Sequence, residues 1–269
     1  MRRNWFRPLA INLFRRFNPG NITIRHQYTG DRILLHSFQH RAYWYKGKSR
    51  ERSTMELFAR LIAPGDFVID IGGHIGYITL YLASLVGERG KVVVFEPGPN
   101  NLPYIRANVQ GHATIDLVEK AASDLVGPAL FYIENLTGQN NSLLSHYAVF
   151  EANARFSGIS GDTMTVEVDC TTVDDFLETE RLPIPSLIKI DVEGAELAVL
   201  TGMTVLLRKP GVALMVEVTE QKQSVFDFLT DRGYVLFNER KCRLSEASSL
   251  AFNVFCLRQD DPRIGVLES

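Results

Sequence analysis

The chain is predicted to fold as an α/β domain with a mostly parallel sheet and helices on both faces. Two stretches carry this prediction, residues 67–80 and residues 186–206, and each begins as a short apolar run typical of a strand buried on both faces. Each run ends in a carboxylate and a glycine-containing turn, after which apolar residues recur at helical spacing. Strand, tight turn and helix together open a nucleotide-binding βαβ unit, so the sequence predicts a nucleotide site at these turns.

Length and composition set the domain organisation. The chain has 269 residues, of which 45% are hydrophobic and 22% charged, as expected for one α/β domain with a full core. Residues 1–52 contain 12 Lys/Arg and 2 Asp/Glu, whereas the rest of the chain is acidic and the formal net charge is −2. We therefore divide the chain into a basic, aromatic N-terminal extension (1–52) and a catalytic domain (53–269), with an inserted β region at 125–170.

The N-terminal extension leaves two interpretations open. Residues 1–20 interleave aromatic and aliphatic residues with arginines, which fits either a helix lying on a membrane surface or a helix docked on the domain. Residues 22–26 and 32–37 are β-type segments, and the basic, aromatic stretch 41–50 either contacts an acceptor or belongs to an ordinary hairpin. Residues 53–63 are expected to form a helix with a capping box between Ser53 and Glu56.

The cysteines and apolar runs indicate a cytoplasmic protein. Cys170, Cys242 and Cys256 lack metal-ligand spacing, and an odd, sparse number is typical of reduced thiols. No apolar run reaches the roughly 18–20 residues needed to span a bilayer, and the N-terminus lacks the apolar core of a signal peptide. We expect no metal site and no nucleic-acid partner, and peripheral membrane contact through residues 1–20 stays an open alternative.

The first motif follows the strand expected at 67–71. Asp70 is expected at the end of this strand beside the ligand crevice, and the turn residues Gly72, Gly73, His74 and Gly76 follow it. A carboxylate there would repel the pyrophosphate that a dinucleotide places at a helix N-terminus. It would favour a ligand with an ammonium and a sulfonium group, so we predict S-adenosylmethionine (SAM) as the cofactor and these five residues as contacts to it.

The second strand, 91–96, ends in another acid. Glu96 lies 20 residues after Gly76, the spacing of a carboxylate that accepts hydrogen bonds from the ribose hydroxyls of a bound nucleotide. Pro97 begins the turn that leads into a helix expected at 101–110. We assign Glu96 to the ribose and place Pro97 beside it.

The third strand, expected at 114–121, leads to the adenine end of the site. Ala121 and Ala122 are small enough to admit an adenine ring, and Asp124 is a candidate for its amino group. Between strands expected at 129–134 and 163–169 lies a polar stretch in which Asn141 and Ser142 are candidates for closing over the cofactor or acceptor. A plain turn and a solvated hairpin are the alternatives.

The second strong motif follows a short helix that begins at residues 172–175. A buried strand at 186–191 ends in Asp191, and Glu193 lies in the turn that follows. If this strand lies next to the first, where the order of the sheet reverses, Asp191 faces the same crevice as Asp70. Strands expected at 212–218, 234–237 and 252–257 bring the sheet to seven.

These motifs resemble the FkbM family of class I SAM-dependent methyltransferases. The resemblance is carried by five blocks between about residues 55 and 220, at 68–79, 94–97, 121–124, 172–175 and 188–196. It implies a Rossmann-like sheet of strand order 3-2-1-4-5-7-6 and O-methylation of a hydroxyl on a sugar, glycolipid or polyketide-type acceptor. One departure is that the family usually has Ala-Asn where this chain has Gly73–His74.

Methyl transfer to an alcohol benefits from a general base. Asp191 is the first candidate, Glu193 the second and His74 the third. Two other classes stay open. An NAD(P)-dependent oxidoreductase shares the sheet but needs Gly-x-Gly-x-x-Gly, and a non-catalytic module with this fold would bind cofactor without transferring a methyl group.

Overall fold

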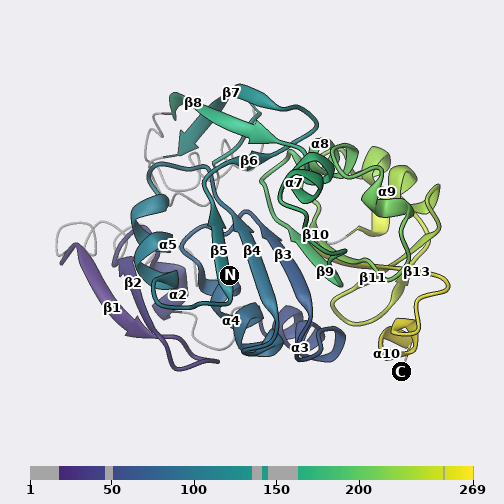
Figure 1. The fold of residues 1–269 in the computed structure, drawn as a ribbon, viewed down its shortest axis with the longest axis horizontal. Helices are drawn as coiled ribbons and strands as arrows, with labels where there is room; N and C mark the ends of the chain where they lie inside the picture. Colours follow the sequence, from purple (N-terminus) through teal and green to yellow (C-terminus); the bar gives the residue numbers. More distant parts are fainter. Residues whose placement is uncertain (1–17, 46–50, 135–140, 145–162, 251, 269) are drawn as a thin grey trace, which may run out of the picture.

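A computed structural model describes residues 18–45, 51–134, 141–144, 163–250 and 252–268. The main sheet contains eight strands in the order β12-β11-β13-β10-β9-β3-β4-β5 (Figure 1). Its strands are β3 (Phe67–Ile71), β4 (Lys91–Phe95), β5 (Ile115–Val118), β9 (Leu187–Ile190), β10 (Ala213–Glu217), β11 (Tyr234–Asn238), β12 (Arg243–Leu244) and β13 (Asn253–Arg258).

Seven of these strands follow the expected order 3-2-1-4-5-7-6, and the eighth corrects the expected number. The pairs from β5 to β10 are parallel, whereas β13 runs antiparallel to both β10 and β11. The extra strand, β12, is a two-residue edge that pairs antiparallel with β11. In the centre, Ile69 of β3 lies between Val93 of β4 and Ile188 of β9.

Alternate residues of the central strands serve two separate cores. Val68, Val92 and Val94 face a core formed with α2 (Arg41–Tyr45), α3 (Arg52–Leu61), α4 (Tyr77–Val86), α5 (Leu102–Val109) and α10 (Ile264–Glu268). Ile69 and Val93 face the opposite core, which contains residues of α7 (Val173–Thr179), α8 (Glu196–Thr201), α9 (Lys222–Thr230) and the 3₁₀ turn η2 (Leu206–Arg208), and Leu250, directly after the 3₁₀ turn η3 (Ala247–Ser249). Because both faces are covered, these strands are apolar apart from the buried, paired Asp70 of β3 and Lys189 of β9 and the half-buried Lys91 that begins β4.

The inserted region forms a small second sheet above the carboxyl ends of the main strands (Figure 1). It contains β6 (Ala121–Ala122), β7 (Gly127–Glu134) and β8 (Thr163–Thr171). The prediction of one strand at 114–121 is therefore wrong. The segment forms two strands: β5, which ends at Val118 and belongs to the main sheet, and β6, which pairs parallel with β8. Neighbouring α7 begins as expected, since the Thr172 side chain accepts a hydrogen bond of 3.0 Å from the Asp175 amide.

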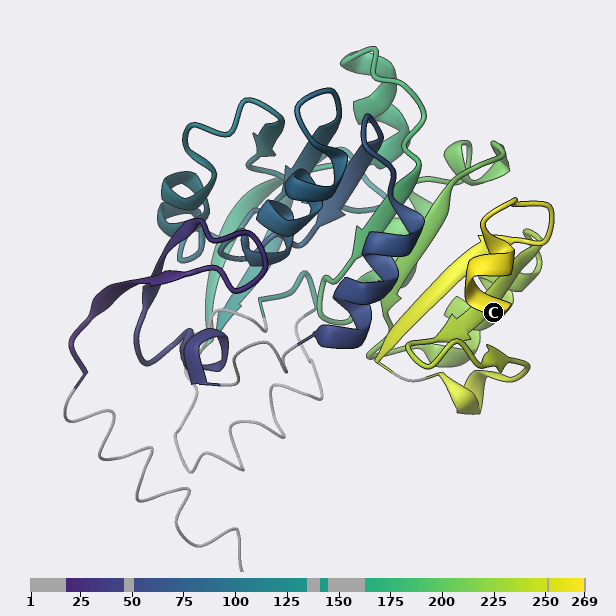
Figure 2. The same ribbon diagram turned by 90° about the horizontal axis from the view of Figure 1, so that it is seen from below.

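The N-terminal hairpin shares the core of the domain. β1 (Asn21–Arg25) and β2 (Arg32–His36) pair antiparallel and lie beside α5 in two views (Figures 1 and 2). The buried side chains of Ile33 and Leu35 belong to the same cluster as α3 and α4. The helix proposed within residues 1–20 lies largely outside the described residues.

Helix α3 begins differently from the expected capping box. It starts at Arg52, after Glu51, which has a φ of 56° and forms no side-chain cap hydrogen bond. Ser53 lies inside the first turn, so the Ser53–Glu56 pair is not a capping box. Among the described helices, none is long and apolar enough to cross a membrane.

Candidate active site

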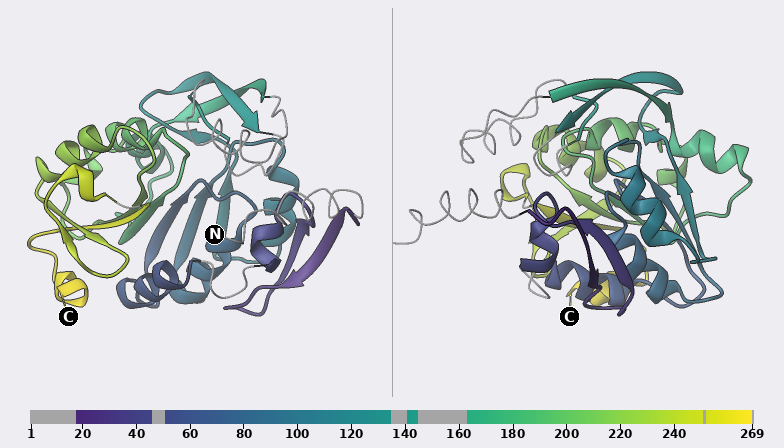
Figure 3. Two further views of the ribbon diagram at one scale, coloured as in Figure 1. Left: turned by 180° about the vertical axis from the view of Figure 1, so that it is seen from behind. Right: turned by 90° about the vertical axis from the view of Figure 1, so that its left-hand side faces the viewer.

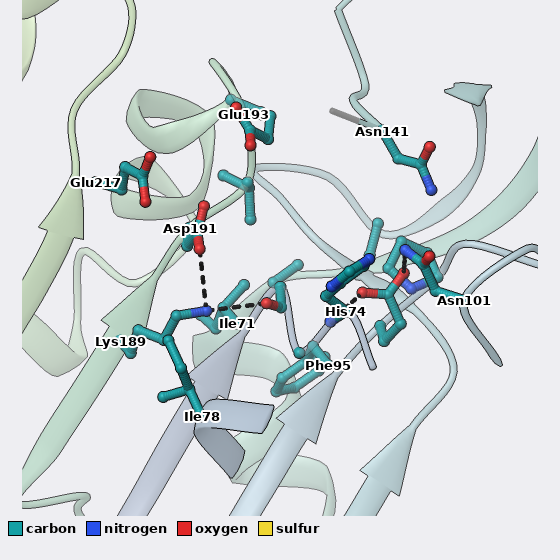
Figure 4. A pocket seen from close by; sticks show the side chains of 18 of the residues that line it. Ile71, His74, Ile78, Phe95, Asn101, Asn141, Lys189, Asp191, Glu193 and Glu217 are labelled. Carbon is teal, nitrogen blue, oxygen red and sulfur yellow. Dashed lines mark hydrogen bonds and ion pairs between the residues drawn. The ribbon is translucent and has the colours of Figure 1, made fainter. Parts of the chain in front are cut away.

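A cleft lies across the carboxyl ends of the parallel strands, where the chain order of the sheet reverses between β3 and β9. This is the place where ligands bind in open α/β sheets. Ten of the predicted site residues line it: Gly72, Gly73, His74, Glu96, Pro97, Ala121, Ala122, Asn141, Asp191 and Glu193. Figure 4 shows Asp191, Glu193 and Glu217 at one end of the cleft and His74, Asn101 and Asn141 at the other.

The glycine turn after β3 brings the backbone close to the neighbouring loops. Gly72 has a φ of 84°, and a Cβ atom there would lie 1.8 Å from the Asp191 carbonyl oxygen. At Gly73 a Cβ would lie 2.3 Å from Val94 Cγ2, so a side chain here would require a neighbour to shift. His74 has a φ of 51°, in the left-handed region that Asn and His tolerate better than most side chains.

This turn directs a backbone amide at Glu96. The amide of His74 donates a 2.7 Å hydrogen bond to Oε2 of Glu96, while the Gly98 amide and Asn101 Nδ2 donate to Oε1 at 2.8 and 3.2 Å. Burial raises the pKa of Glu96 to about 7, against the lowering effect of these donors. Each carboxylate oxygen has two lone-pair sites, so Oε2 retains acceptor capacity for a ribose hydroxyl.

Asp70 does not face the cleft, and its predicted contact with the cofactor is wrong. The side chain is fully buried beneath the turn, where Oδ2 accepts a 2.7 Å hydrogen bond from the Thr79 hydroxyl. Lys189 Nζ lies 3.0 Å from Oδ1 of Asp70 and donates a 2.9 Å hydrogen bond to the Gly72 carbonyl oxygen. The negative charge of Asp70 is thus balanced inside the protein.

Lys189 also reaches the carboxylate that does face the cleft. Its Nζ lies 3.5 Å from Oδ2 of Asp191, whose side chain is 26% exposed (Figure 4). The carboxylates raise the pKa of Lys189 against the opposing effect of burial, with Asp70 contributing more than Asp191. Lys189 therefore stays charged and joins the turn after β3 to the end of β9.

The end of β10 supplies a further carboxyl group. The pKa of Glu217 is raised to about 9, most of all by the nearby negative charge of Asp191, then by burial and then by Glu193 and Glu51. Lys189 lowers this pKa only partly. The Glu217 carboxyl forms no hydrogen bond or ion pair with a described residue, and it lines the cleft (Figure 4). Of the charged described residues that line the cleft, five are carboxylates and only Lys189 is a cation.

The loop between β7 and β8 contributes to the site in the described residues 141–144. Asn141 lines the cleft and donates a 2.8 Å hydrogen bond from Nδ2 to Asn100 Oδ1. Ser142 does not line it. Instead its Oγ donates to the Glu193 carbonyl oxygen at 2.8 Å, so it ties this segment to the turn after β9.

Two other predicted contacts lie outside the cleft. Asp124 is exposed and accepts a 3.1 Å hydrogen bond from the Ser123 hydroxyl, so its assignment to adenine is not supported. Gly76 has a φ of 83° at the start of α4, where a Cβ would meet Ile105 of α5 at 3.3 Å. Its role is to begin the helix and let α5 approach.

The N-terminal extension contributes Tyr43 to the cleft. Its hydroxyl lies 2.9 Å from His74 Nδ1, and the two rings stack with a centroid distance of 5.7 Å. The His40 ring meets His74 edge-on, and burial lowers the pKa of His40 to about 3, so this neighbour is neutral. The orientation of His74, the third base candidate, therefore depends on residues before the catalytic domain.

The residues present fit SAM. Ala121 and Ala122 line the end of the cleft near β5, Glu96 follows at β4, and the glycine turn and Asp191 follow at β3 and β9. This order gives small side chains for adenine, a carboxylate for the ribose diol, and negative charge for the ammonium and sulfonium groups. A dinucleotide would instead place its pyrophosphate among carboxylates.

The sheet and cleft define a Rossmann-like α/β protein with a nucleotide site at the switch point of the sheet. Residues 70–236 match the methyltransferase FkbM domain, which is more than half of the chain. The chain therefore belongs to the FkbM methyltransferase family, as its motifs suggested.

Several curated proteins resemble the chain. Methyltransferase 1 of Beauveria bassiana is 28% identical over 51% of this chain and 58% of its own length. The hexuronic acid methyltransferase AglP of Haloferax volcanii is 24% identical over 57% and 56%. The 31-O-demethyl-FK506 methyltransferase FkbM of Streptomyces tacrolimicus is 25% identical over 69% and 74%. The chain thus spans less than two thirds of the length of the first two.

Solved structures also resemble it. The crystal structure of methyltransferase FkbM from Methylobacillus flagellatus KT matches 75% of this chain and 50% of that chain, with 14% identity and a TM-score of 0.44.

Sequence reasoning missed three residues of the site: Lys189, Glu217 and Tyr43. Lys189 had a visible signal, because a lysine inside an otherwise apolar buried strand requires partners. Glu217 had the same signal as Asp191, an acid at the end of a buried strand. Tyr43 lies in the basic, aromatic stretch 41–50 that was a candidate acceptor contact, but no local pattern placed it beside His74, because that contact depends on how the N-terminal segment packs.

Proposed function

We propose that the chain is a SAM-dependent methyltransferase that acts on a hydroxyl of a sugar, glycolipid or polyketide-type acceptor. The observation that carries the proposal is the acid-lined cleft at the switch point, with Glu96 buried at the end of β4 and Asp191 opposite the glycine turn. The name of one relative, 31-O-demethyl-FK506 methyltransferase, supports an oxygen acceptor.

The protein's contribution is to position the acceptor and to take its proton. When bound, SAM supplies a methyl group attached to a positively charged sulfur, and the thioether that remains after transfer is the leaving group. Holding an acceptor oxygen in line with that group is worth roughly 7–11 kcal/mol, and a general base adds about 10²–10⁴-fold. Asp191 is the first candidate for the base because it lines the cleft and is oriented by Lys189. Glu193 and His74 also line the cleft and remain the second and third candidates.

Methyl-labelled SAM tests the proposal directly. The protein is incubated with the labelled cofactor and a panel of glycosides and polyketide alcohols, and label in the acceptor is measured. We expect transfer to at least one hydroxyl. If the protein binds SAM but labels none of them, the non-catalytic interpretation replaces the proposal.

Asp191→Asn tests the assignment of the base. The change keeps the shape but removes the proton acceptor, so we expect turnover at saturating SAM to fall by at least about 10²-fold, beyond any weakening of SAM binding from the loss of one negative charge. Asp231→Asn, at an exposed position after α9, is the matched control and should leave both unchanged. Wild-type turnover in Asp191→Asn would exclude Asp191 and move the assignment to Glu193 or His74.

A further inference from the structure

A second cavity continues the cleft beyond the end of β10. It is lined by Glu51, Arg52, Ser53, Glu217, Glu239, Phe252 and Asn253, and it shares Glu51 and Glu217 with the cleft. We call it the acidic cavity. The proposed cofactor groups run along the sheet from β5 to β9, so the next position along the sheet belongs to the acceptor.

One carboxylate of the acidic cavity, that of Glu239, is held in place by two hydrogen bonds. Glu239 Oε1 accepts from the Thr54 hydroxyl at 2.6 Å and from Asn253 Nδ2 at 2.9 Å. The same Nδ2 lies 3.5 Å from Oε2 of Glu51. The two N–H groups of this amide have Glu239 Oε1 and Thr54 Oγ1 as near acceptors, both at 2.9 Å, so the amide fixes Glu239, with Glu51 a more distant neighbour and Glu217 the third carboxylate of the cavity.

The carbonyl of that amide points to a missing donor. Asn253 is only 6% exposed, and its Oδ1 accepts no hydrogen bond from any described residue. A buried acceptor without a donor is costly, because it has given up its hydrogen bonds to water and gained none in return. The three carboxylates that line the cavity beside this amide accept hydrogen bonds from a ligand and have few N–H or O–H groups to offer it.

Two further residues indicate the charge and shape of the ligand. Phe252, at the rim, is 67% exposed, and an aromatic face there attracts a cation or covers a sugar ring. Arg52 is the only cation among the described residues that line the acidic cavity, against three carboxylates. An anionic acceptor such as a uronic acid would be repelled by this balance.

We propose that the acceptor carries a protonated amine close to the hydroxyl that is methylated, as in an amino sugar, and that the acidic cavity binds this ammonium group. The ammonium donates to Glu217 and Glu239, and its positive charge removes the repulsion among the carboxylates. This assignment rests on the proposed methyltransferase function and names the class of its acceptor.

The field around Glu217 adds a consequence of binding. Three carboxylates act on Glu217: Asp191 at the end of β9, Glu193 in the turn that follows, and Glu51 just before α3. Glu239 lines the same cavity, and Lys189 is the nearby cation. Without ligand, Glu217 therefore holds a proton at neutral pH. Binding of an ammonium group should release that proton, so affinity should rise with pH up to the pKa of the amine.

Calorimetry on protein saturated with S-adenosylhomocysteine, the demethylated form of the cofactor, tests the proposal without turnover. The probes are the methyl glycosides of glucosamine, N-acetylglucosamine and glucuronic acid, which are cationic, neutral and anionic. We expect the glucosamine glycoside to bind at least 10-fold more tightly than the other two, and with proton release between buffers of different ionisation enthalpy. Equal binding, tighter binding of the neutral or anionic glycoside, or no binding of the amine would overturn the proposal.

Two variants localise the effect. Glu217→Gln and Glu239→Gln keep the side-chain shape, and the amide oxygen introduced by Glu239→Gln would still accept from Thr54 and Asn253, so both variants should fold. Each should reduce the preference for the amine at least 5-fold, whereas Glu246→Gln, exposed and outside both cavities, should not. A preserved preference in both cavity variants would contradict the proposal. The two readouts also separate the two proposals. If the protein does not bind S-adenosylhomocysteine but still prefers the amine glycoside, the methyltransferase proposal fails and the amine site stands.

Discussion

Lys189 determines how charge is distributed at the site. It lies 3.0 Å from the buried carboxylate of Asp70 and 3.5 Å from the accessible carboxylate of Asp191. A buried charge is tolerated only when it is paired and hydrogen-bonded, and Lys189 satisfies this through Asp70 and the Gly72 carbonyl. The ion pair therefore neutralises the acid below the turn and leaves Asp191 and Glu193 to set the negative potential in the cleft, which Glu217 joins only when it loses its proton.

At this scale the sequence predicted the types of residue better than their directions. Both acids that end the first and fourth strands were assigned to one crevice, but only Asp191 faces it. Asp70 belongs to the strand itself and alternation directs it into the protein, whereas Asp191 follows the last strand residue. Which carboxylate is accessible depends on Lys189, and its contacts with Asp70 and Gly72 join distant parts of the chain.

Glu217 should make the stability of the protein depend on pH. Its pKa rises from 4.5 in the unfolded chain to about 9 in the folded protein, so the folded state binds the proton more tightly. The resulting stabilisation is complete below pH 4.5 and is lost as the pH rises through about 9. Glu217→Gln should therefore be more stable than the wild type at pH 9, by roughly 1–3 kcal/mol, with a flatter dependence of Tm on pH between about 5 and 9.

Thermal unfolding across this range is the measurement, and Glu246→Gln serves as the exposed control. Parallel Tm curves for the wild type and Glu217→Gln would show that Glu217 is already ionised at neutral pH. That result would also remove the proton release expected on amine binding.

At the scale of elements, the turn between β3 and α4 connects the sequence to the site. Gly72, His74 and Gly76 all have positive φ angles, and the turn packs against both Val94 and Ile105. The sequence predicted this strand, turn and helix closely, because glycines and buried apolar runs leave strong local signals. It did not predict that Ala121–Ala122 pairs with Cys170–Thr171, because the partner lies about 50 residues further along the chain.

Gly73→Ala tests the packing of this turn. The added Cβ would lie 2.3 Å from Val94 Cγ2 and 2.9 Å from Ile105 Cδ1, so something must shift. We expect the free energy of unfolding to fall by about 1–3 kcal/mol, as for overpacking of a core. SAM affinity should fall as well, because the same turn positions the His74 amide on Glu96.

Chemical denaturation and calorimetry measure the two effects. Gly265→Ala, in helix α10, is the control because no atom lies within 4 Å of its added Cβ. A Gly73→Ala variant with the wild-type free energy of unfolding and SAM affinity would mean that the turn is less tightly packed than its contacts indicate.

At the scale of the whole molecule, the N-terminal extension and the catalytic domain act together. Figure 3 shows the hairpin beside the helices on one side of the sheet, far from the C-terminus. Asn108 of α5 connects the hairpin to the turn before α4. Its Oδ1 accepts a 2.7 Å hydrogen bond from the Leu34 amide. Its Nδ2 donates to the carbonyl oxygens of Leu34 at 2.9 Å and Ile75 at 2.8 Å. From the sequence, residues 1–52 were predicted to be a separate extension, because contacts between distant segments leave no local pattern.

Asn108→Ala should loosen the hairpin and the site together. It removes three hydrogen bonds at a position that is 4% exposed, so we expect a loss of at least about 2 kcal/mol in the free energy of unfolding. Hydrogen exchange should show faster opening of residues 21–36 and of the turn around His74. Asn21→Ala, which removes one exposed hydrogen bond to Tyr104, should cost less than about 1 kcal/mol. Equal effects of the two variants would contradict the link.

Binding of SAM through Glu96 is the central claim, and calorimetric titration tests it most directly. SAM and NAD are titrated separately into the wild type, Glu96→Ala and Glu88→Ala, the last being an exposed acid after α4. We predict that the wild type binds SAM and not NAD. Loss of one or two hydrogen bonds to a charged group, worth about 1.5–3 kcal/mol each, should weaken SAM binding at least 10-fold in Glu96→Ala and not in Glu88→Ala. Preference for NAD, or wild-type affinity for SAM in Glu96→Ala, would contradict it.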